Sequence, residues 1–139
     1  MNRDEIKQFF KNDRFADLVG AQIESLSAEE VVCSLSIQPH HLNAGNKVQG
    51  GVLFTLADFA FAVACNYADL EKGNNNITVS HAAQIHYFKP ASGDKLTVKT
   101  ECLQQGRKLS VYRMRVWDAE GALVAEMTGD AYTVALTHP

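Results

Sequence analysis

Asp58 is the residue most suited to chemistry, because it lies alone in an apolar segment. It is the one charged side chain between Lys47 and Asp69, and residues 50–65 are otherwise glycine, threonine, cysteine or apolar. A helix that is apolar all round is a buried helix, where an uncompensated carboxylate is costly. No lysine, arginine or histidine lies three or four residues away to pair with Asp58. We therefore expect it to act as a general base or a nucleophile, the alternative being a solvent-facing position.

The start of the same helix offers hydrogen-bond donors for a developing negative charge. Gly50 and Gly51 leave backbone N–H groups uncovered by any Cβ, and the helix dipole favours an anion there. Asn43, in the preceding polar loop, adds a side-chain amide donor. Donors of this kind together with a carboxylate suit acyl transfer to water. The alternatives are close helix–sheet packing for the glycines and a plain turn for Asn43.

The spacing of these groups predicts a site shared by two chains. Asp58 follows Gly51 by seven residues, which is about 10 Å along a helix at about 1.5 Å per residue. A base and an oxyanion hole must both lie within about 3 Å of the reacting group. Two antiparallel helices across a dimer axis satisfy this requirement, with Gly50 and Asn43 from one chain and Asp58 from the other.

The elements around this segment predict an α+β fold. A short helix carries Ile6, Phe9 and Phe10, and a further turn from Asp13 ends at Gly20. The central helix covers 51–67, and strands are expected at 21–26, 31–38, 77–86, 96–102, 109–117 and 123–134. One apolar helix beside an antiparallel sheet must be wrapped by that sheet. Pairing of the exposed edge strands between subunits would hide them, so we expect a homodimer or a dimer of dimers.

Composition narrows the class of protein. The chain has 139 residues, which suits a single domain over 1–139. Its formal net charge of −3 excludes the basic footprint of a nucleic-acid-binding protein. The three cysteines have no CxxC spacing and are expected to be reduced and buried. The N-terminus lacks an apolar signal core, and we read the apolar run as a core helix, so we expect a soluble, cytoplasmic protein with no membrane partner.

Other polar residues offer weaker candidates. Adjacent histidines such as His40 and His41 point opposite ways on an extended chain, so we expect no metal, and His41 is better suited to bracing its loop. Ser80 and His81 are neighbours on a strand and do not form a catalytic triad with Asp58. A regular strand would place Ser80 opposite Ile77, Val79 and Ile85, which leaves open the face that a site would use.

The motif from His41 to Asp58 resembles one known family. The pattern His-x-Asn-x-x-Gly-x-x-x-Gly-Gly followed by Leu-Ala-Asp is similar to that of hotdog-fold thioesterases of the PaaI-like, acyl-CoA-hydrolysing type, and the likeness runs from about Phe15 to Val134. It implies a hotdog fold, an acyl-CoA substrate and no cofactor. Many relatives carry histidine before the glycine pair, where this chain has Gln49.

The resemblance also implies roles for individual residues. Asp58 would be the nucleophile or base, the Gly50 N–H and Asn43 would polarise the thioester carbonyl, and Ser80 would position water. We place Gln49, Gly51, His41 and Arg107 among the substrate-binding residues, with Arg107 a candidate for the phosphates of CoA or else part of a solvated turn.

Two further functions compete with hydrolysis. A non-catalytic protein that binds acyl-CoA or an aromatic ligand would share the same pocket. A hydratase would need a histidine paired with the carboxylate, and the helix has none near Asp58.

Overall fold

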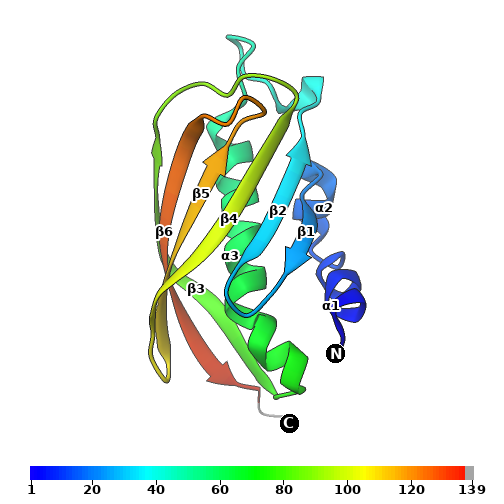
Figure 1. Ribbon diagram of the computed structural model, residues 1–139, viewed down its shortest axis with the longest axis vertical. Helices are drawn as coiled ribbons and strands as arrows, with labels where there is room; N and C mark the ends of the chain where they lie inside the picture. Colours follow the sequence, from blue (N-terminus) through cyan, green and yellow to red (C-terminus); the bar gives the residue numbers. More distant parts are fainter. Residues whose placement is uncertain (137–139) are drawn as a thin grey trace.

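The computed structural model describes residues 1–136, which fold into three helices, a 3₁₀ turn and six strands (Figure 1). In chain order these elements are α1 (Arg3–Phe10), α2 (Arg14–Val19), β1 (Gln22–Leu26), β2 (Val31–Ser36), η1 (Pro39–His41), α3 (Gly50–Lys72), β3 (Asn76–Tyr87), β4 (Lys95–Gln105), β5 (Leu109–Trp117) and β6 (Leu123–Ala135).

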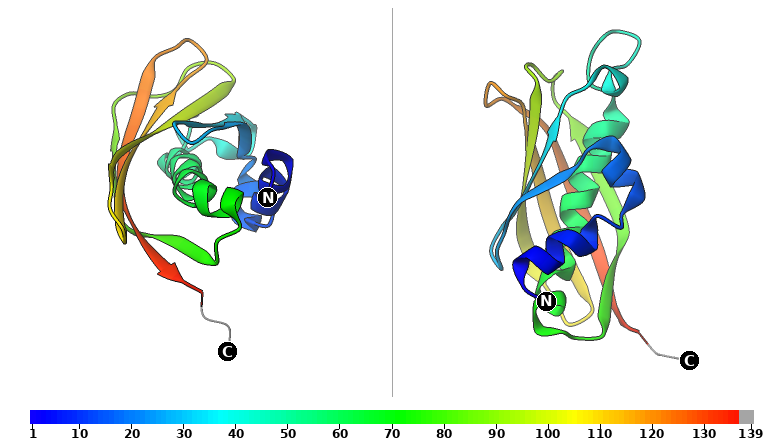
Figure 2. Two further views of the ribbon diagram at one scale, coloured as in Figure 1. Left: turned by 60° about the horizontal axis from the view of Figure 1, so that its bottom comes forward. Right: turned by 90° about the vertical axis from the view of Figure 1, so that its right-hand side faces the viewer.

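The six strands form one antiparallel sheet in the order β1-β2-β4-β5-β6-β3. The sheet curves around α3, and α1 and α2 lie on the side of α3 away from the sheet (Figure 2). The predicted α+β class, with a central helix wrapped by an antiparallel sheet, is therefore confirmed. The face of α3 turned away from the sheet is the one left for a site.

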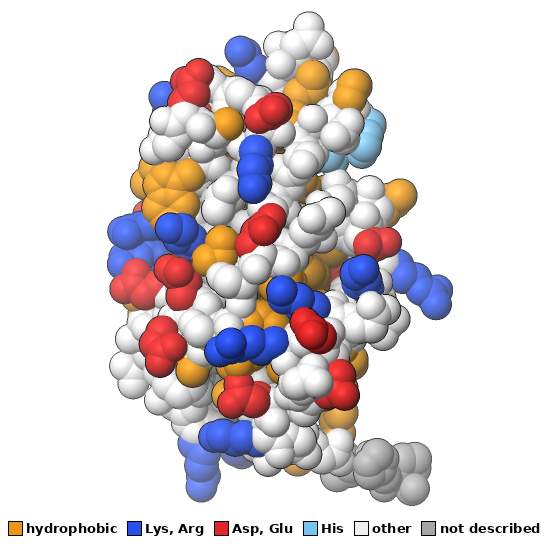
Figure 3. All heavy atoms as spheres, turned by 45° about the vertical axis from the view of Figure 1, so that its right-hand side comes forward, with side chains coloured by type: hydrophobic (Ala, Val, Ile, Leu, Met, Phe, Trp, Pro, Cys, Tyr) orange, Lys and Arg blue, Asp and Glu red, His pale blue; other side chains and the backbone are white. Residues whose placement is uncertain are grey.

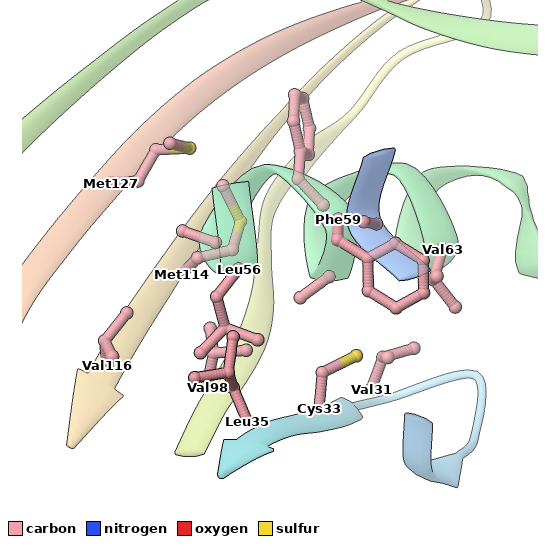
Figure 4. Close-up of a cluster of buried hydrophobic side chains, with 14 of the residues drawn as sticks. Val31, Cys33, Leu35, Leu56, Phe59, Val63, Val98, Met114, Val116 and Met127 are labelled. Carbon is pink, nitrogen blue, oxygen red and sulfur yellow. The ribbon is translucent and has the colours of Figure 1, made fainter. Parts of the chain in front are cut away.

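The core fills the space between α3 and the concave face of the sheet. Leu56 and Val63 of α3 are fully buried and meet Val98, Met114 and other strand side chains (Figure 4). Each large apolar side chain buried in this way contributes roughly 1.5–3 kcal/mol. This packing fixes α3 against the sheet, so residues on its outer face are held by a rigid support.

The central helix is longer than the sequence predicts, ending at Lys72 rather than near residue 67. Leu70 still packs against the core, but Glu71 and Lys72 are exposed, so the apolar pattern stops before the helix does. The helix ends at Gly73, whose φ of 73° is left-handed and easily adopted by glycine. Among the described residues α3 alone has the length and composition of a membrane span. Eight of its side chains are buried in the protein, which agrees with the core helix predicted from the sequence.

The two N-terminal helices are held by specific caps. The Asn2 side chain accepts a hydrogen bond from the Glu5 N–H in a capping box. The Asp13 side chain accepts from the Ala16 N–H at 3.1 Å, and α2 ends at Gly20, with φ at 102°. Both ends of α2 are thus fixed, as the sequence predicts.

Strand β3 forms an edge of the sheet and contains a bulge. Ser80 pairs with Ala131 and Ala82 with Asp130, so His81 is the extra residue. Because of this bulge Ser80 faces the same side as Ile85, toward α3, so that part of the expectation was wrong. Ser80 still lies opposite Ile77 and Val79, which precede the bulge. Earlier in β3 the Asn66 side chain of α3 bonds both the N–H and the C=O of Thr78, at 2.8 and 2.9 Å. From Ser80 onward the outer edge has no such cover within the described residues.

Charged residues of both signs are interspersed on the surface, and the face in Figure 3 carries no extended basic block. The three cysteines are free, but their burial differs from expectation. Cys33 is buried, Cys65 is half-buried and Cys102 is exposed, because Cys102 falls on the outer part of β4, which extends beyond the core.

Candidate active site

Asp58 lies half-buried in a cavity of about 240 Å³ on the outer face of α3. The lining residues are Asp13, Phe15, Ala16, Phe54, Thr55, Asp58 and Phe59. None of them is a cation, and within residues 1–136 the carboxylate makes no hydrogen bond or ion pair. Burial, and secondarily the negative charge of Asp13, raise the pKa of Asp58 above the usual aspartate range. A carboxylate whose pKa is raised toward neutrality is better suited to accept a proton from water.

The first residues of α3 leave one backbone donor free. The Gln49 side chain caps the helix and accepts a hydrogen bond from the Gly51 N–H at 3.1 Å. The Val52 N–H donates to the Gln49 carbonyl at 2.9 Å. Within the described residues the Gly50 N–H donates to nothing. It is therefore Gly50, rather than Gly51, whose N–H is available to a ligand.

Asn43 shapes the loop that precedes this helix end. Its Oδ1 accepts hydrogen bonds from the Gly45 N–H at 2.9 Å and the Lys47 N–H at 3.1 Å. These bonds are those of a turn, and they use the side-chain oxygen while leaving the Nδ2 donors free within the described residues. Asn43 thus holds the loop and still has a donor for a ligand.

His41 braces the loop from inside. It is buried, and its Nδ1 accepts a hydrogen bond from the Gln38 N–H at 2.9 Å. Since Nδ1 accepts, Nε2 carries the proton and donates to the Val19 carbonyl at 2.6 Å. Neither ring nitrogen is left for a substrate, so His41 fits the bracing role and not the substrate-binding one. The bond also ties the loop to the C-terminal end of α2.

A second cavity connects the helix start with Asp58. It has a volume of about 350 Å³ and reaches Gln49 and Gly51. It shares Phe15, Phe54 and Thr55 with the Asp58 cavity. The two cavities therefore form one groove along the outer face of α3, which we call the α3 groove.

The remaining candidates lie outside this groove. Ser80 is exposed on β3 and turned toward the α3 side of the sheet, at the start of the free strand edge. Arg107 is exposed on the β4–β5 turn, at the end of the molecule opposite the start of α3 (Figure 1). Within one chain neither residue lines the α3 groove.

Three contacts near the site were not predicted from the sequence. Asp13 lines the Asp58 cavity, although in sequence it marks only a helix start. Phe15 borders both cavities. The Tyr87 hydroxyl donates to the Gly50 carbonyl at 3.2 Å, and its ring lies where a Gly50 side chain would begin. All are long-range contacts, for which local sequence carries no signal.

Comparisons with known proteins agree with this geometry. A family model described as the thioesterase superfamily matches residues 45–125, which include Gly50 and Asp58. The acyl-coenzyme A thioesterase PaaI of Escherichia coli is 30% identical over 92% of this chain and 88% of its own length. A putative esterase of Archaeoglobus fulgidus is 31% identical over 90% of this chain and 78% of its own length.

Solved structures show the same arrangement of elements. The structure of the E. coli PaaI protein matches with a TM-score of 0.83 and 29% identity, over 94% of this chain and 91% of that one. A hypothetical thioesterase from Streptococcus pneumoniae, solved with coenzyme A, matches with a TM-score of 0.80 and 25% identity, over 94% of this chain and 98% of that one.

Proposed function

Because this chain belongs to the thioesterase superfamily and shares its hotdog fold, we propose that it is an acyl-CoA thioesterase. Water and the thioester would give a free acid and CoA, with the whole chain acting as one domain. The observation that carries the proposal is Asp58, a carboxylate without a cation beside it, half-buried in a groove that leads to the start of α3. The PaaI relative named above is an acyl-coenzyme A thioesterase, which supports the choice of substrate.

The proposed chemistry combines Asp58, which lines the groove, with the hydrogen-bond donors at the start of α3. Asp58 takes a proton from water as the water oxygen attacks the thioester carbonyl carbon. The carbonyl oxygen becomes negative and is stabilised by the Gly50 N–H, the dipole of α3 and the Nδ2 group of Asn43. The C–S bond then breaks, and the sulfur leaves as the thiol of CoA after taking up a proton. Ser80 is placed in the proposal as a hydrogen-bond partner for the water.

We place the site between two chains, since Asp58 follows Gly50 of the same chain by eight residues, about 12 Å along α3 at about 1.5 Å per residue. Two features of the structure support a partner. The edge of β3 is free from Ser80 onward, while Asn66 covers it at Thr78. A stripe of half-buried side chains, including Phe54, also runs down the outer face of α3. A twofold dimer through β3 would pair the free edges and bring Asp58 of each chain to the partner's helix start.

The test is release of thiol from acyl-CoAs of varied length and aromaticity by the purified protein. We expect hydrolysis by the wild type, loss of roughly 10²-fold or more in kcat for Asp58→Asn, and little change for Asp69→Asn, the other aspartate of α3. Unchanged turnover in Asp58→Asn would contradict the mechanism. Binding of acyl-CoA by the wild type without thiol release would instead favour the non-catalytic alternative.

A further inference from the structure

Phe15 of α2 lies between the two cavities of the α3 groove. One cavity holds Asp58 and the other reaches Gly51, and Phe15, Phe54 and Thr55 border both. Phe15 belongs to α2 whereas the other two belong to α3, so Phe15 forms the opposite wall. It is 63% exposed although it borders both cavities. A ligand in the groove would therefore cover this ring.

Three hydrogen bonds hold α2, the helix that carries Phe15. Asp13 caps its first turn through the Ala16 N–H. The Gly20 N–H closes its last turn on the Ala16 carbonyl at 2.9 Å. His41 ties Val19 to the loop before α3 at 2.6 Å. The caps thus hold the helical backbone around Phe15, and the His41 bond fixes the C-terminal end of α2 to the loop before α3. The width of the groove therefore depends on the size of the side chain at position 15.

The proposed function places the reacting carbonyl beside Asp58, and the cavity that contains Asp58 is part of the α3 groove. An acyl group on that carbonyl would enter this groove. Ligand pockets are lined mainly by apolar and aromatic side chains, usually with volumes of roughly 300–1,000 Å³. The cavity that holds Asp58, with a volume of about 240 Å³, is below this range, and the second cavity, with about 350 Å³, is at its lower end. We propose that Phe15 is a specificity-determining residue, whose ring narrows the α3 groove beside Asp58 and limits the size of the acyl group. This inference rests on the proposed function.

The test compares Phe15→Ala with Leu18→Ala. Leu18 is on the same short helix and is 75% exposed, but it lines neither cavity. For each variant kcat/KM is measured by thiol release across straight-chain acyl-CoAs of increasing length and aromatic acyl-CoAs of increasing width. In Phe15→Ala the ratio of kcat/KM for the largest accepted acyl group to that for the smallest should rise roughly tenfold or more, mainly through KM. Leu18→Ala should keep the wild-type profile.

Phe15→Leu provides the same test if the alanine variant does not fold, as judged by its thermal midpoint. It should shift the profile in the same direction by a smaller factor. A wild-type profile in a folded Phe15 variant, or an equal shift in Leu18→Ala, would overturn the inference.

Binding separates this inference from the proposed function. Dissociation constants of the same acyl-CoAs are measured for Asp58→Asn with and without Phe15→Ala, so no turnover is needed. If the wild type releases no thiol, the proposed function fails. If the added Phe15→Ala change leaves the order of affinities across acyl groups unaltered, the specificity role fails.

Discussion

Replacing Gly50 by proline removes the backbone donor that we assign to the thioester oxygen and leaves the local fold intact. Gly50 is the first residue of α3, where proline is favoured because its missing N–H is not needed by the helix. Gln49 already has φ −67° and ψ 141°, the conformation that a residue before proline prefers. Within residues 1–136 the Gly50 N–H has no acceptor, so its loss breaks no intramolecular hydrogen bond.

Gly50→Ala is the matched control, because it adds a Cβ in the same place and keeps the N–H. That Cβ would lie 3.2 Å from Cζ and 3.4 Å from the hydroxyl of Tyr87. The ring is half exposed at the end of β3 and has to move by a few tenths of an ångström. The hydrogen bond at risk, from the Tyr87 hydroxyl to the Gly50 carbonyl at 3.2 Å, contributes about 0.5–1.5 kcal/mol. Both variants place a Cβ at this position and so share this cost.

The difference between the two variants measures the donor. Loss of one oxyanion-hole donor lowers kcat by roughly 10²–10³-fold. We therefore expect Gly50→Pro to turn over an accepted acyl-CoA at least roughly 10²-fold more slowly than Gly50→Ala in a thiol-release assay, with similar midpoints of urea unfolding. Equal kcat values in two folded variants would refute the oxyanion role and leave helix–sheet packing as the function of this glycine.

Three further predictions concern the surroundings of the site. Burial raises the pKa of Asp58 in the folded protein, so the wild type loses stability as the pH rises through that pKa. Asp58→Asn should therefore be more stable to urea than the wild type at neutral pH. The difference in the free energy of unfolding between the two proteins should disappear below the ordinary aspartate pKa of about 3.9. Asp13→Asn keeps the helix cap but removes the negative charge beside Asp58. The acidic limb of the profile of kcat/KM against pH should therefore move to lower pH. Asp17→Asn is the control, because Asp17 lines a different cavity, and it should leave the acidic limb in place. Asn66→Ala should lower the free energy of unfolding by about 1–3 kcal/mol in urea titrations, since two hydrogen bonds to Thr78 are lost. A change near zero would show that water replaces the amide at no cost.

The order of the elements could be predicted because each has a local signature. Alternation of apolar and polar residues marked the strands, and the apolar run around Asp58 marked the central helix. The extent of α2, from Asp13 to Gly20, could also be predicted, since the residues that begin and end a helix act within one turn. The end of α3 was misplaced because three of its last four residues, Asp69, Glu71 and Lys72, are charged and leave only Leu70 to continue the apolar pattern.

The arrangement of the site could be predicted from the sequence only in part. Sequence singled out Asp58 as an unpaired carboxylate, and the structure puts it in a half-buried cavity. Sequence did not reveal that Asp13 and Phe15 form the other side of that cavity, since they are 39 or more positions away in the chain from the α3 residues that line it. The bulge at His81, which turns Ser80 toward α3, depends on pairing with β6 rather than on local propensity.

The most direct test of a shared hydrolytic site is complementation between two inactive chains. Asp58→Asn and Gly50→Pro chains are unfolded, mixed in equal amounts, refolded together and assayed for thiol release. In a twofold dimer each mixed pair regains one intact site, so the mixture should recover about one quarter of wild-type activity, while each variant refolded alone stays inactive. If size-exclusion and mass measurements show mixed dimers and the mixture remains as inactive as its components, Asp58 and Gly50 do not act together across the subunit boundary.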